Sequence, residues 1–396
     1  MIANCSHRPR IAFIFNYITP YRVTFFEKLC TCPDYEWLVI HGTKVKNDGR
    51  PAYQGPINFP NRRLKFVELK AGPFSIRWHK GIMKSIREWK PDVVITLGIP
   101  SILTNWLAIT WAHRYGAKTI TWHSGWESQS SNKFILPIKH FILKKYLSSV
   151  DSILVYSTKG STYLSSLDNR LAKKITICYN GLEISTLSNN EDAYLNKAKL
   201  LRDQLQLNNK KIFLYVGGIA LEKQVSLLLK AFQQLSNQEN LILWIVGDGP
   251  GLPEIQKMVE ILKLGQVKIW GRVTKDVDVI FAAADYFILP GIGGLALNQA
   301  LFWKLPCVVS EADGTEKDLV FENQTGFYFA PNDFNSLHFA MEKCLGLSDQ
   351  QRVDFGNAGR NLILHRSNVD KMIETFVSKI FDVLNEDNSS SSESNK

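Results

Sequence analysis

Three glycines at a predicted strand-to-helix turn are the residues of this chain best suited to hold an anion. Gly291, Gly293 and Gly294 follow the apolar run YFILP and precede a helical segment that begins near Leu295. Glycines let the backbone approach a ligand closely, and the start of a helix presents unpaired N–H groups and the positive end of its dipole. The pattern therefore predicts a phosphate-binding turn.

A histidine in the first half of the chain is a second candidate. His123 ends the apolar run TITW and is followed by Ser124 and Gly125. A lone histidine is usually structural, but ligands of open α/β proteins bind where parallel strands end. We therefore expect His123 to face a ligand site.

The elements that must position these residues alternate between short apolar runs and helical patterns. Because this alternation is typical of parallel sheets covered on both faces, two doubly wound, Rossmann-like α/β domains are predicted, with ligands in an interdomain cleft between the carboxyl ends of both sheets. The expected strands of the first half are residues 10–18, 35–42, 62–70, 91–98, 117–125, 151–158 and 173–181, with helical patterns that include 23–30, 75–89 and 101–116. The second half repeats the rhythm with strands at 210–218, 241–249, 267–273, 285–291, 305–310 and 326–331, and helices at 225–235 and 253–264.

The loop after the first strand of each half lacks the G-x-G-x-x-G fingerprint of a dinucleotide site, so a nicotinamide enzyme is not expected.

The domain boundaries follow from the patterns of strands and helices. We expect an N-terminal domain over residues 8–185, a linker and lead-in helix over 186–209, a C-terminal domain over 210–365, a helix over 366–385 and a disordered tail over 386–396.

Composition narrows the class of protein. At 396 residues with 45% hydrophobic and 21% charged residues, the chain has the composition of a globular protein with large cores. The net charge of +10 favours an acidic partner, but the basic residues are scattered and form no recognised nucleic-acid module, so nucleic acid is not expected. The six cysteines suggest neither a disulfide framework nor a metal site, which fits a reducing cytoplasm. No signal peptide or spanning helix is expected, so any membrane contact is peripheral.

One segment could make that contact. In PIKHFILKKYL, apolar residues interleave with Lys139, His140, Lys144 and Lys145. A helix with this pattern either lies on an anionic membrane surface or packs on a domain core.

The chain resembles family 4 glycosyltransferases of the GT-B fold, most strongly over residues 211–330. That family has at the glycine turn a pattern of Glu, seven residues, Glu, then small residues and Pro-Val-Val, with the second Glu at the ribose hydroxyls. Counted back from Pro306, Gly291 stands in place of the first Glu and Gln299 in place of the second. The resemblance implies that Gln299 can still hydrogen-bond a hydroxyl pair, whereas Gly291 supplies only backbone.

Other matches imply further site residues. YVGGIALEK resembles the family's V-G-R-L-x-x-x-K loop, which implies that Gly217 and Gly218 line the donor site and that Lys223 stabilises the departing diphosphate. Gly218 stands where the family has an arginine. The segment SEADGTEKDLV resembles the family's loop ending in Glu, which makes Asp313, Gly314 and Glu316 candidates to contact the donor.

The family's histidine near the donor sugar matches His123, so Lys223, His123 and Glu316 are the expected catalytic residues. Four residues are assigned to the acceptor side: Trp126 and Glu127, and Tyr21 and Arg22, which suit an anionic acceptor such as a lipid-linked phosphate.

Together these matches imply a retaining glycosyltransferase of the surface polysaccharide type. It would transfer a sugar from a nucleotide diphosphate sugar to a saccharide or lipid-linked acceptor, with no cofactor and no metal. The expected location is the cytoplasm, with the inner face of the plasma membrane as a second option. The missing arginine and glutamates keep open an alternative, a GT-B pseudoenzyme that binds a nucleotide sugar or a partner transferase without turnover.

Overall fold

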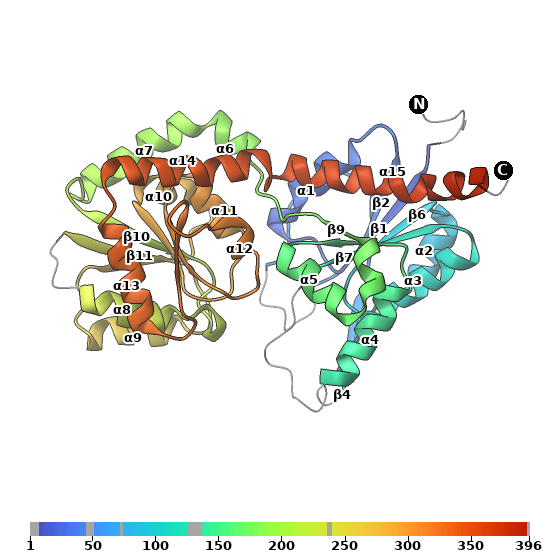
Figure 1. The fold of residues 1–396 in the computed structure, drawn as a ribbon, viewed down its shortest axis with the longest axis horizontal. Helices are drawn as coiled ribbons and strands as arrows, with labels where there is room; N and C mark the ends of the chain where they lie inside the picture. Colours follow the sequence, from blue (N-terminus) through green and yellow to red (C-terminus); the bar gives the residue numbers. More distant parts are fainter. Residues whose placement is uncertain (1–7, 45–50, 72–73, 126–135, 236–239, 394–396) are drawn as a thin grey trace. The chain divides into compact units, whose positions relative to one another are not determined.

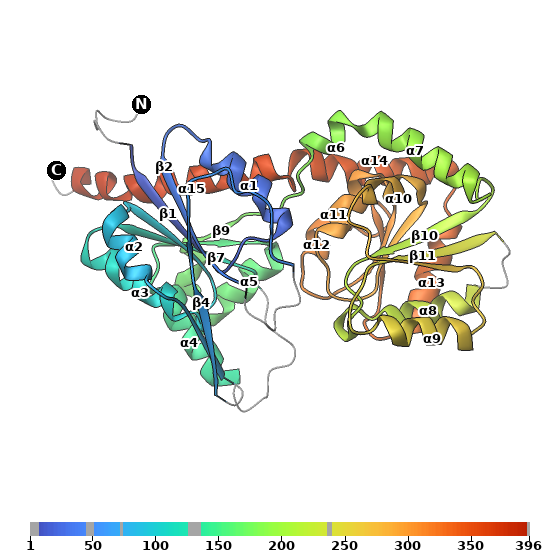
Figure 2. The same cartoon turned by 180° about the vertical axis from the view of Figure 1, so that it is seen from behind.

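A computed structural model describes residues 8–44, 51–71, 74–125, 136–235 and 240–393 of the chain. It divides into two compact units, shown in Figures 1 and 2. Unit 1 comprises residues 1–178 and 372–396, and unit 2 comprises residues 179–371. The chain therefore passes between the units twice, and each unit is described by itself.

Unit 1 is built on a parallel sheet of seven strands in the order β3-β2-β1-β6-β7-β8-β9. Its central strands are almost completely buried, as expected for apolar runs covered by helices on both faces. The strands are β1 (Arg10–Phe15), β2 (Glu36–Gly42), β3 (Asn61–Leu64), β6 (Val93–Leu97), β7 (Lys118–His123), β8 (Ser152–Val155) and β9 (Ile175–Ile177). The helices are α1 (Pro20–Cys30), α2 (Ile82–Trp89), α3 (Leu103–Arg114), α4 (Leu136–Ser148), α5 (Thr158–Leu167), the 3-10 helix η1 (Asn169–Lys174) and α15 (Val369–Glu393).

An antiparallel hairpin in unit 1 differs from the sequence prediction. β4 (Phe66–Ala71) pairs with β5 (Phe74–His79). The helix predicted over residues 75–89 is therefore wrong for its first part, which forms β5, and only α2 is helical. The expected strand at 62–70 is likewise divided between β3 and β4. The reason is tertiary: the alternation in SIRWH fits a strand once a partner strand lies beside it, and pairing with β4 decides between the two periods.

Unit 2 is built on a parallel sheet of six strands in the order β12-β11-β10-β13-β14-β15. The strands are β10 (Lys211–Val216), β11 (Leu241–Val246), β12 (Val267–Gly271), β13 (Tyr286–Leu289), β14 (Cys307–Ser310) and β15 (Gly326–Phe329). The helices are α6 (Ser185–Asn189), α7 (Glu191–Gln204), the 3-10 helix η2 (Leu221–Lys223), α8 (Val225–Leu235), α9 (Leu252–Ile261), α10 (Val277–Ala283), α11 (Leu295–Phe302), α12 (Glu316–Leu319), α13 (Phe334–Leu345) and α14 (Asp349–His365).

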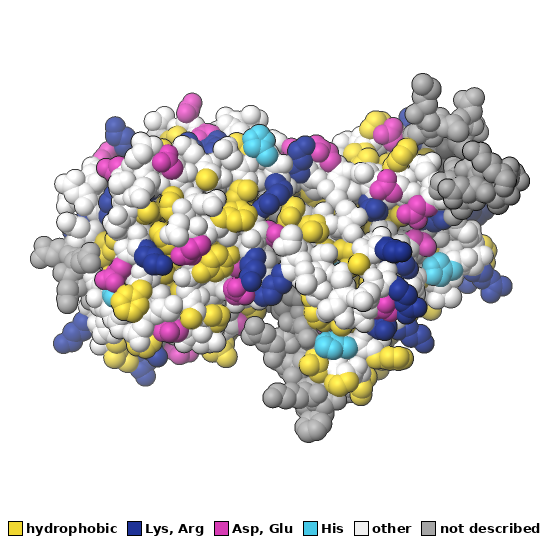
Figure 3. All heavy atoms as spheres, viewed as in Figure 1, with side chains coloured by type: hydrophobic (Ala, Val, Ile, Leu, Met, Phe, Trp, Pro, Cys, Tyr) yellow, Lys and Arg dark blue, Asp and Glu magenta, His cyan; other side chains and the backbone are white. Residues whose placement is uncertain are grey.

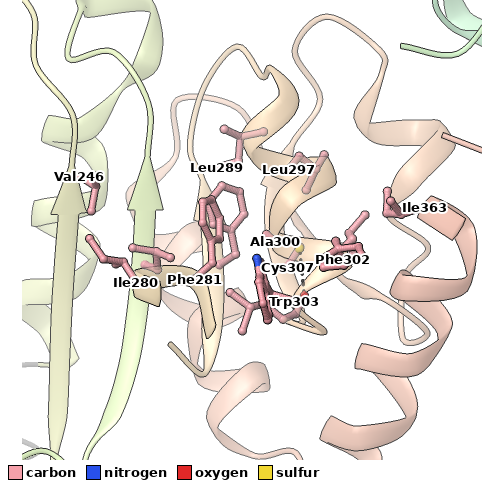
Figure 4. Packing of buried hydrophobic residues seen from close by; sticks show 14 of the residues in the cluster. Val246, Ile280, Phe281, Leu289, Leu297, Ala300, Phe302, Trp303, Cys307 and Ile363 are labelled. Atoms are coloured by element: carbon pink, nitrogen blue, oxygen red, sulfur yellow. Dashed lines mark hydrogen bonds between the residues drawn. The ribbon is translucent and has the colours of Figure 1, made fainter. Parts of the chain in front are cut away.

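The core of unit 2 fixes α11, the helix that follows the glycine turn. Figure 4 shows Leu297, Ala300 and Trp303 packed among Phe281, Leu289 and other buried residues. Burial of this apolar face stabilises the helix far more than its intrinsic propensity does, because the helix is only eight residues long. The glycine turn is therefore attached to a rigid element.

The last helix extends beyond the bound of residue 385 that the sequence predicts. α15 continues to Glu393, into residues 386–396 that are expected to be disordered. No proline or glycine interrupts the chain after Val369, so nothing in the sequence forces the helix to stop. From Met372 on, α15 belongs to unit 1, where Phe376 packs against Phe13, Phe25 and Trp122.

Candidate functional site

Three loops meet at one edge of the unit 2 sheet because β10, β13 and β14 are parallel neighbours. The loop after β10 carries Lys223, the glycine turn follows β13, and the loop after β14 carries Asp313 and Glu316. The carboxyl ends of parallel strands lie at the same edge, which is where ligands bind in such sheets.

The glycine turn is packed directly on the loop that carries Lys223. A Cβ atom built on Gly291 would meet the carbonyl oxygen of Glu222 and lie 2.9 Å from the carbonyl carbon of Lys223. The amide of Ile292 donates to the carbonyl of Glu222 at 3.2 Å. Gly291 is therefore required for this close approach, and a side chain of any size is excluded there.

Lys223 holds the turn through its ammonium group. Its Nζ donates to the carbonyl oxygens of Ile292 at 2.6 Å and Gly293 at 3.0 Å. Burial lowers the pKa of Lys223, while the nearby charges of Asp313 and Glu222 oppose that shift. An ammonium group has three donors, so two bonds to the turn leave a third for a ligand.

The acidic loop is organised by its own side chains. Glu316 is only 1% exposed and accepts hydrogen bonds from the amides of Ala312 and Gly314. Asp313 accepts from the amide and the hydroxyl of Thr315, at 3.0 and 2.6 Å. Burial and, next, the charge of Asp313 raise the pKa of Glu316 to about 7. Glu316 thus holds the loop around Gly314, and its carboxyl group is poised to change charge near neutral pH.

Asp313 connects the three loops. A Cβ on Gly293 would lie 3.9 Å from Oδ2 of Asp313 and 3.8 Å from the hydroxyl of Thr315. The charge of Asp313 also acts on the pKa values of both Lys223 and Glu316. The structure therefore brings Lys223, the glycine turn, Asp313 and Glu316 together. Thr315, which the sequence did not single out, belongs to the same group.

Gly217, Gly218 and Gly294 differ from Gly291 in the space around them. The Tyr215 hydroxyl donates to the carbonyl of Gly218 at 2.8 Å, and a Cβ on Gly217 would contact that same hydroxyl. A Cβ on Gly218 would meet only the carbonyl of Asp248, at 3.9 Å, and one on Gly294 would meet nothing within 4 Å. Gly294 lies directly before Leu295, the first residue of α11. The loop could thus accept a side chain at Gly218.

Gln299 is engaged inside unit 2. Its Nε2 donates to Oδ1 of Asp278 at 2.6 Å, and the indole N–H of Trp303 donates to the same oxygen at 2.8 Å. Asp278 is 9% exposed and lies in the first turn of α10. Asp278 is the second residue of the mostly apolar segment VDVIFAA, and nothing in that pattern indicates a contact with Gln299. One of the two N–H donors of the Gln299 amide is therefore used inside unit 2.

The corresponding edge of unit 1 places His123 at the end of β7. Its Nδ1 accepts from the amide of Gly125 at 2.7 Å, so a neutral ring carries its proton on Nε2. Burial lowers the pKa of His123 to about 4. A Cβ on Gly98 would lie 2.5 Å from Cδ2 of the ring, so Gly98 makes room for the imidazole. His123 is thus a neutral hydrogen-bond donor.

Arg22 is buried at the same edge of unit 1, whereas Tyr21 is 46% exposed. The Arg22 guanidinium lies 4.6 Å from the ring of Trp122, and its nitrogens contact the Tyr156 hydroxyl at 3.4 Å and the Met372 sulfur at 3.8 Å. No acidic side chain pairs with Arg22 in the described parts of the chain. Trp126 and Glu127 lie outside the described residues.

Two features are absent from the described residues. These residues contain no cluster of three or more His, Cys, Asp or Glu side chains arranged to bind a metal ion. They also contain no helix with the length and hydropathy needed to cross a bilayer.

Much of unit 2 is similar to a known protein family. Residues 197–362 match the family described as glycosyl transferases group 1. The chain is 26% identical over 151 residues to alpha-D-kanosaminyltransferase of Streptomyces kanamyceticus. The aligned residues are 37% of this chain and 39% of the relative. The chain is 22% identical over 197 residues to N-acetyl-alpha-D-glucosaminyl L-malate synthase of Bacillus anthracis, covering 47% and 51% of the two chains. The chain thus spans about half or less of the length of these relatives.

The fold extends the likeness to the whole chain. The crystal structure of Anabaena Alr3699/HepE in complex with UDP has a TM-score of 0.74 at 14% identity, over 94% of this chain and 100% of that one. The lipopolysaccharide outer core galactosyltransferase WaaB has a TM-score of 0.65 at 15% identity, over 94% and 99%. These similarities and the two parallel sheets confirm the predicted α/β fold of GT-B type. Within that fold, residues 197–362 are the segment that matches the family of glycosyl transferases group 1.

Proposed function

We propose that this chain is a retaining glycosyltransferase that moves a sugar from a nucleotide diphosphate sugar to a saccharide or lipid-linked acceptor. The observation that carries the proposal is the Lys223 ammonium bonded to the glycine turn at the start of α11, inside the segment that matches glycosyl transferases group 1. The solved complexes of Anabaena Alr3699/HepE with UDP and UDP-glucose support a uridine diphosphate sugar as the first donor to test. The product would enter surface polysaccharide or glycolipid assembly.

The donor diphosphate binds against the turn in this proposal. The N–H groups at the start of α11 and the third donor of Lys223 face its negative charge. As the bond between the anomeric carbon and the phosphate oxygen breaks, its electron pair leaves with the diphosphate, and Lys223 stabilises that growing charge. The acceptor hydroxyl bonds to the same face of the anomeric carbon and gives its proton to the departing phosphate oxygen. No enzymic nucleophile is needed for retention.

The other unit 2 residues shape the donor site. Gly217, Gly218, Gly293 and Gly294 let the backbone approach the diphosphate. Asp313 contacts donor hydroxyls, and Glu316 positions Asp313 and Gly314 through its bonds to the loop amides. Gln299 meets the ribose hydroxyls with its carbonyl oxygen and its second N–H, because the bond to Asp278 uses one donor only.

In unit 1, His123 donates a hydrogen bond from Nε2 to a sugar hydroxyl. With a pKa of about 4 and Nδ1 already occupied, it does not serve as a general base near neutral pH. Tyr21 and Arg22, with Trp126 and Glu127, are proposed for the acceptor side. The exposed Tyr21 is the better placed of the first two, because Arg22 is only 4% exposed.

We place the protein in the cytoplasm, where nucleotide sugars are made, with peripheral contact to the inner face of the plasma membrane. The net charge of +10 suits an anionic surface.

A GT-B pseudoenzyme remains the second candidate because of two observations. The packing at Gly291 leaves no room for the glutamate of the family pattern, and the amide of Gln299 is tied to Asp278. A domain that keeps the diphosphate-binding turn but lacks both glutamates of the family pattern would bind a donor without transferring its sugar.

Calorimetry and turnover separate the two candidates. The full chain is titrated with UDP, GDP, ADP and TDP, and a matching panel of sugar nucleotides is followed by NMR for hydrolysis or transfer. We expect binding of one diphosphate and release of a sugar that keeps its anomeric configuration. Binding without turnover across the panel would favour the pseudoenzyme, and inversion of configuration would refute the retaining mechanism.

A further inference from the structure

Helix α4 exposes apolar side chains that are spaced to form one stripe. Ile138, Phe141 and Ile142 are 52%, 67% and 39% exposed. Residues three and four positions apart lie on the same face of a helix, so these three side chains are neighbours. A stripe of this kind normally packs on a core, and here it faces outward.

The opposite end of the same helix is firmly attached to unit 1. Tyr146 is fully buried, and its hydroxyl bonds to the hydroxyls of Thr96 at 2.8 Å and Thr121 at 3.0 Å. The ammonium of Lys174 donates to the carbonyl of Ser148, the last residue of α4. The exposed stripe is therefore presented by an anchored helix, and its exposure does not follow from a loosely attached segment.

Positive charge accompanies the stripe. Lys145 lies one turn beyond Phe141 and Ile142, and Lys139 is next to Ile138; both lysines are exposed. α4 contains no aspartate or glutamate. An apolar stripe with lysines beside it matches a bilayer whose surface carries negative charge, because the rings and branched chains enter the interface while the ammonium groups stay at the headgroups.

A second exposed apolar pair lies on the hairpin. Leu69 of β4 and Ile76 of β5 are directly paired across the strands and are 60% and 50% exposed. In Figures 1 and 2 the hairpin and the start of α4 both extend to the lower end of unit 1. Figure 3 shows hydrophobic side chains gathered at that end over α4, with lysine or arginine side chains nearby.

We infer that the stripe of Ile138, Phe141 and Ile142, with Lys139 and Lys145, docks unit 1 on an anionic lipid bilayer as a peripheral contact. The hairpin pair Leu69 and Ile76 adds apolar contact at the same end. This deepens the proposed function, since it would bring the site to a lipid-linked acceptor. The docking itself rests only on α4 and the hairpin.

The test is flotation of the full chain with vesicles, without nucleotide. Vesicles of equimolar phosphatidylcholine and phosphatidylglycerol are compared with vesicles of phosphatidylcholine alone. We expect binding to the anionic vesicles that weakens as salt rises. The double variant Ile138→Ser/Phe141→Ser should bind about tenfold more weakly. Phe339→Ser is the matched control, because Phe339 on α13 is 61% exposed and lies in unit 2.

Three results would overturn the inference. They are absence of vesicle binding, equal binding by the double variant and the native chain, and a shift from dimer to monomer in the double variant by light scattering, which would make the stripe an interface between copies. Donor calorimetry on the same variants keeps the two proposals apart. Unchanged diphosphate affinity with lost vesicle binding supports docking, whereas vesicle binding by a chain that binds no diphosphate would refute only the donor site.

Discussion

The two candidate ligand edges differ in the way their polar side chains are stabilised. In unit 2, Lys223, Asp313 and Glu316 bond to the backbone and side chains of their own and neighbouring loops and influence one another's charge. In unit 1, His123 and Arg22 are packed against glycine backbone and aromatic rings, with no acidic partner for Arg22 among the described residues. Side chains that influence one another's charge are therefore concentrated in unit 2, whereas the unit 1 edge offers the neutral ring of His123 and the guanidinium of Arg22 in fixed positions.

The largest loss of activity is expected from Lys223→Ala in unit 2. The change removes both the ammonium facing the diphosphate and the two bonds that hold the turn, so kcat/KM should fall by roughly 100- to 1,000-fold. Steady-state kinetics with the donor found by calorimetry measures the loss. Lys230→Ala, at an exposed position of α8, is the control and should leave kcat/KM unchanged. Native activity in Lys223→Ala would move the diphosphate site away from the turn.

The next test uses the coupled carboxyl groups of unit 2. The native pKa of Glu316, about 7, is above its free value of 4.5, so the native state binds more protons than the unfolded chain between these values. The stability contributed by protonated Glu316 is thus fully present below the free pKa and is lost as pH rises through about 7, on the order of 3 kcal/mol.

Thermal unfolding measured from about pH 5 to about pH 8 checks this dependence. Asp313→Asn removes the neighbouring negative charge, so the pKa of Glu316 should fall and the loss of melting temperature over that range should shrink. An equal loss in native protein and Asp313→Asn would show that the two carboxyl groups are not coupled.

The positions of the three site loops could be predicted from the sequence, since each follows a strongly apolar run. Lys223, the glycine turn and Asp313 come after β10, β13 and β14, and parallel neighbours bring such loops to one edge. What the sequence could not supply is the pairing of side chains across elements. Asp278 and Gln299 are 21 residues apart on two helices, and neither local sequence pattern predicts their hydrogen bond.

The same limit explains the hairpin and Gly98. SIRWH fits a strand or a helix until its partner strand is known, and only the pairing with β4 decides. Gly98 has no local signal of its own; its role depends on the His123 ring that the next strand places against it. Long-range packing, which sequence periodicity does not encode, determined both.

Two glycines of the turn in unit 2 differ in how closely they are packed. Gly291→Ala should destabilise the chain by roughly 1–3 kcal/mol, because its Cβ would collide with the carbonyl of Glu222 and force the two loops apart. Gly294→Ala is the matched control, since its Cβ would meet nothing within 4 Å and its φ of 164° is extended backbone. Melting temperatures of both variants give the answer. Equal values would mean that the contact at Gly291 does not hold the loops together.

Gly218→Arg should raise the affinity for the diphosphate, and this effect is smaller than those above. The space at Gly218 accepts a side chain, and a guanidinium there can bond the diphosphate in the manner implied by the family pattern. Calorimetric affinity for the nucleoside diphosphate should rise by roughly tenfold. Gly218→Leu separates charge from bulk and should give no gain. Equal affinities for Gly218→Arg and the native chain would place the diphosphate out of reach of this loop.

The smallest effect is expected at the unit 1 edge, where the charge of His123 should not contribute to the pH dependence of activity. Its pKa of about 4 and the bond from Gly125 to Nδ1 keep the ring neutral, with the proton on Nε2, across the range in which Glu316 titrates. His123→Gln keeps a donor and should therefore show a pH profile of kcat with the same shape as the native one, at a lower height. The ring signals of His123 followed by NMR should likewise stay constant from about pH 6 to about pH 8. A limb of the profile that disappears in His123→Gln would assign proton transfer to this histidine, and the contrast between the titrating carboxyl group of Glu316 in unit 2 and a neutral His123 in unit 1 would fail.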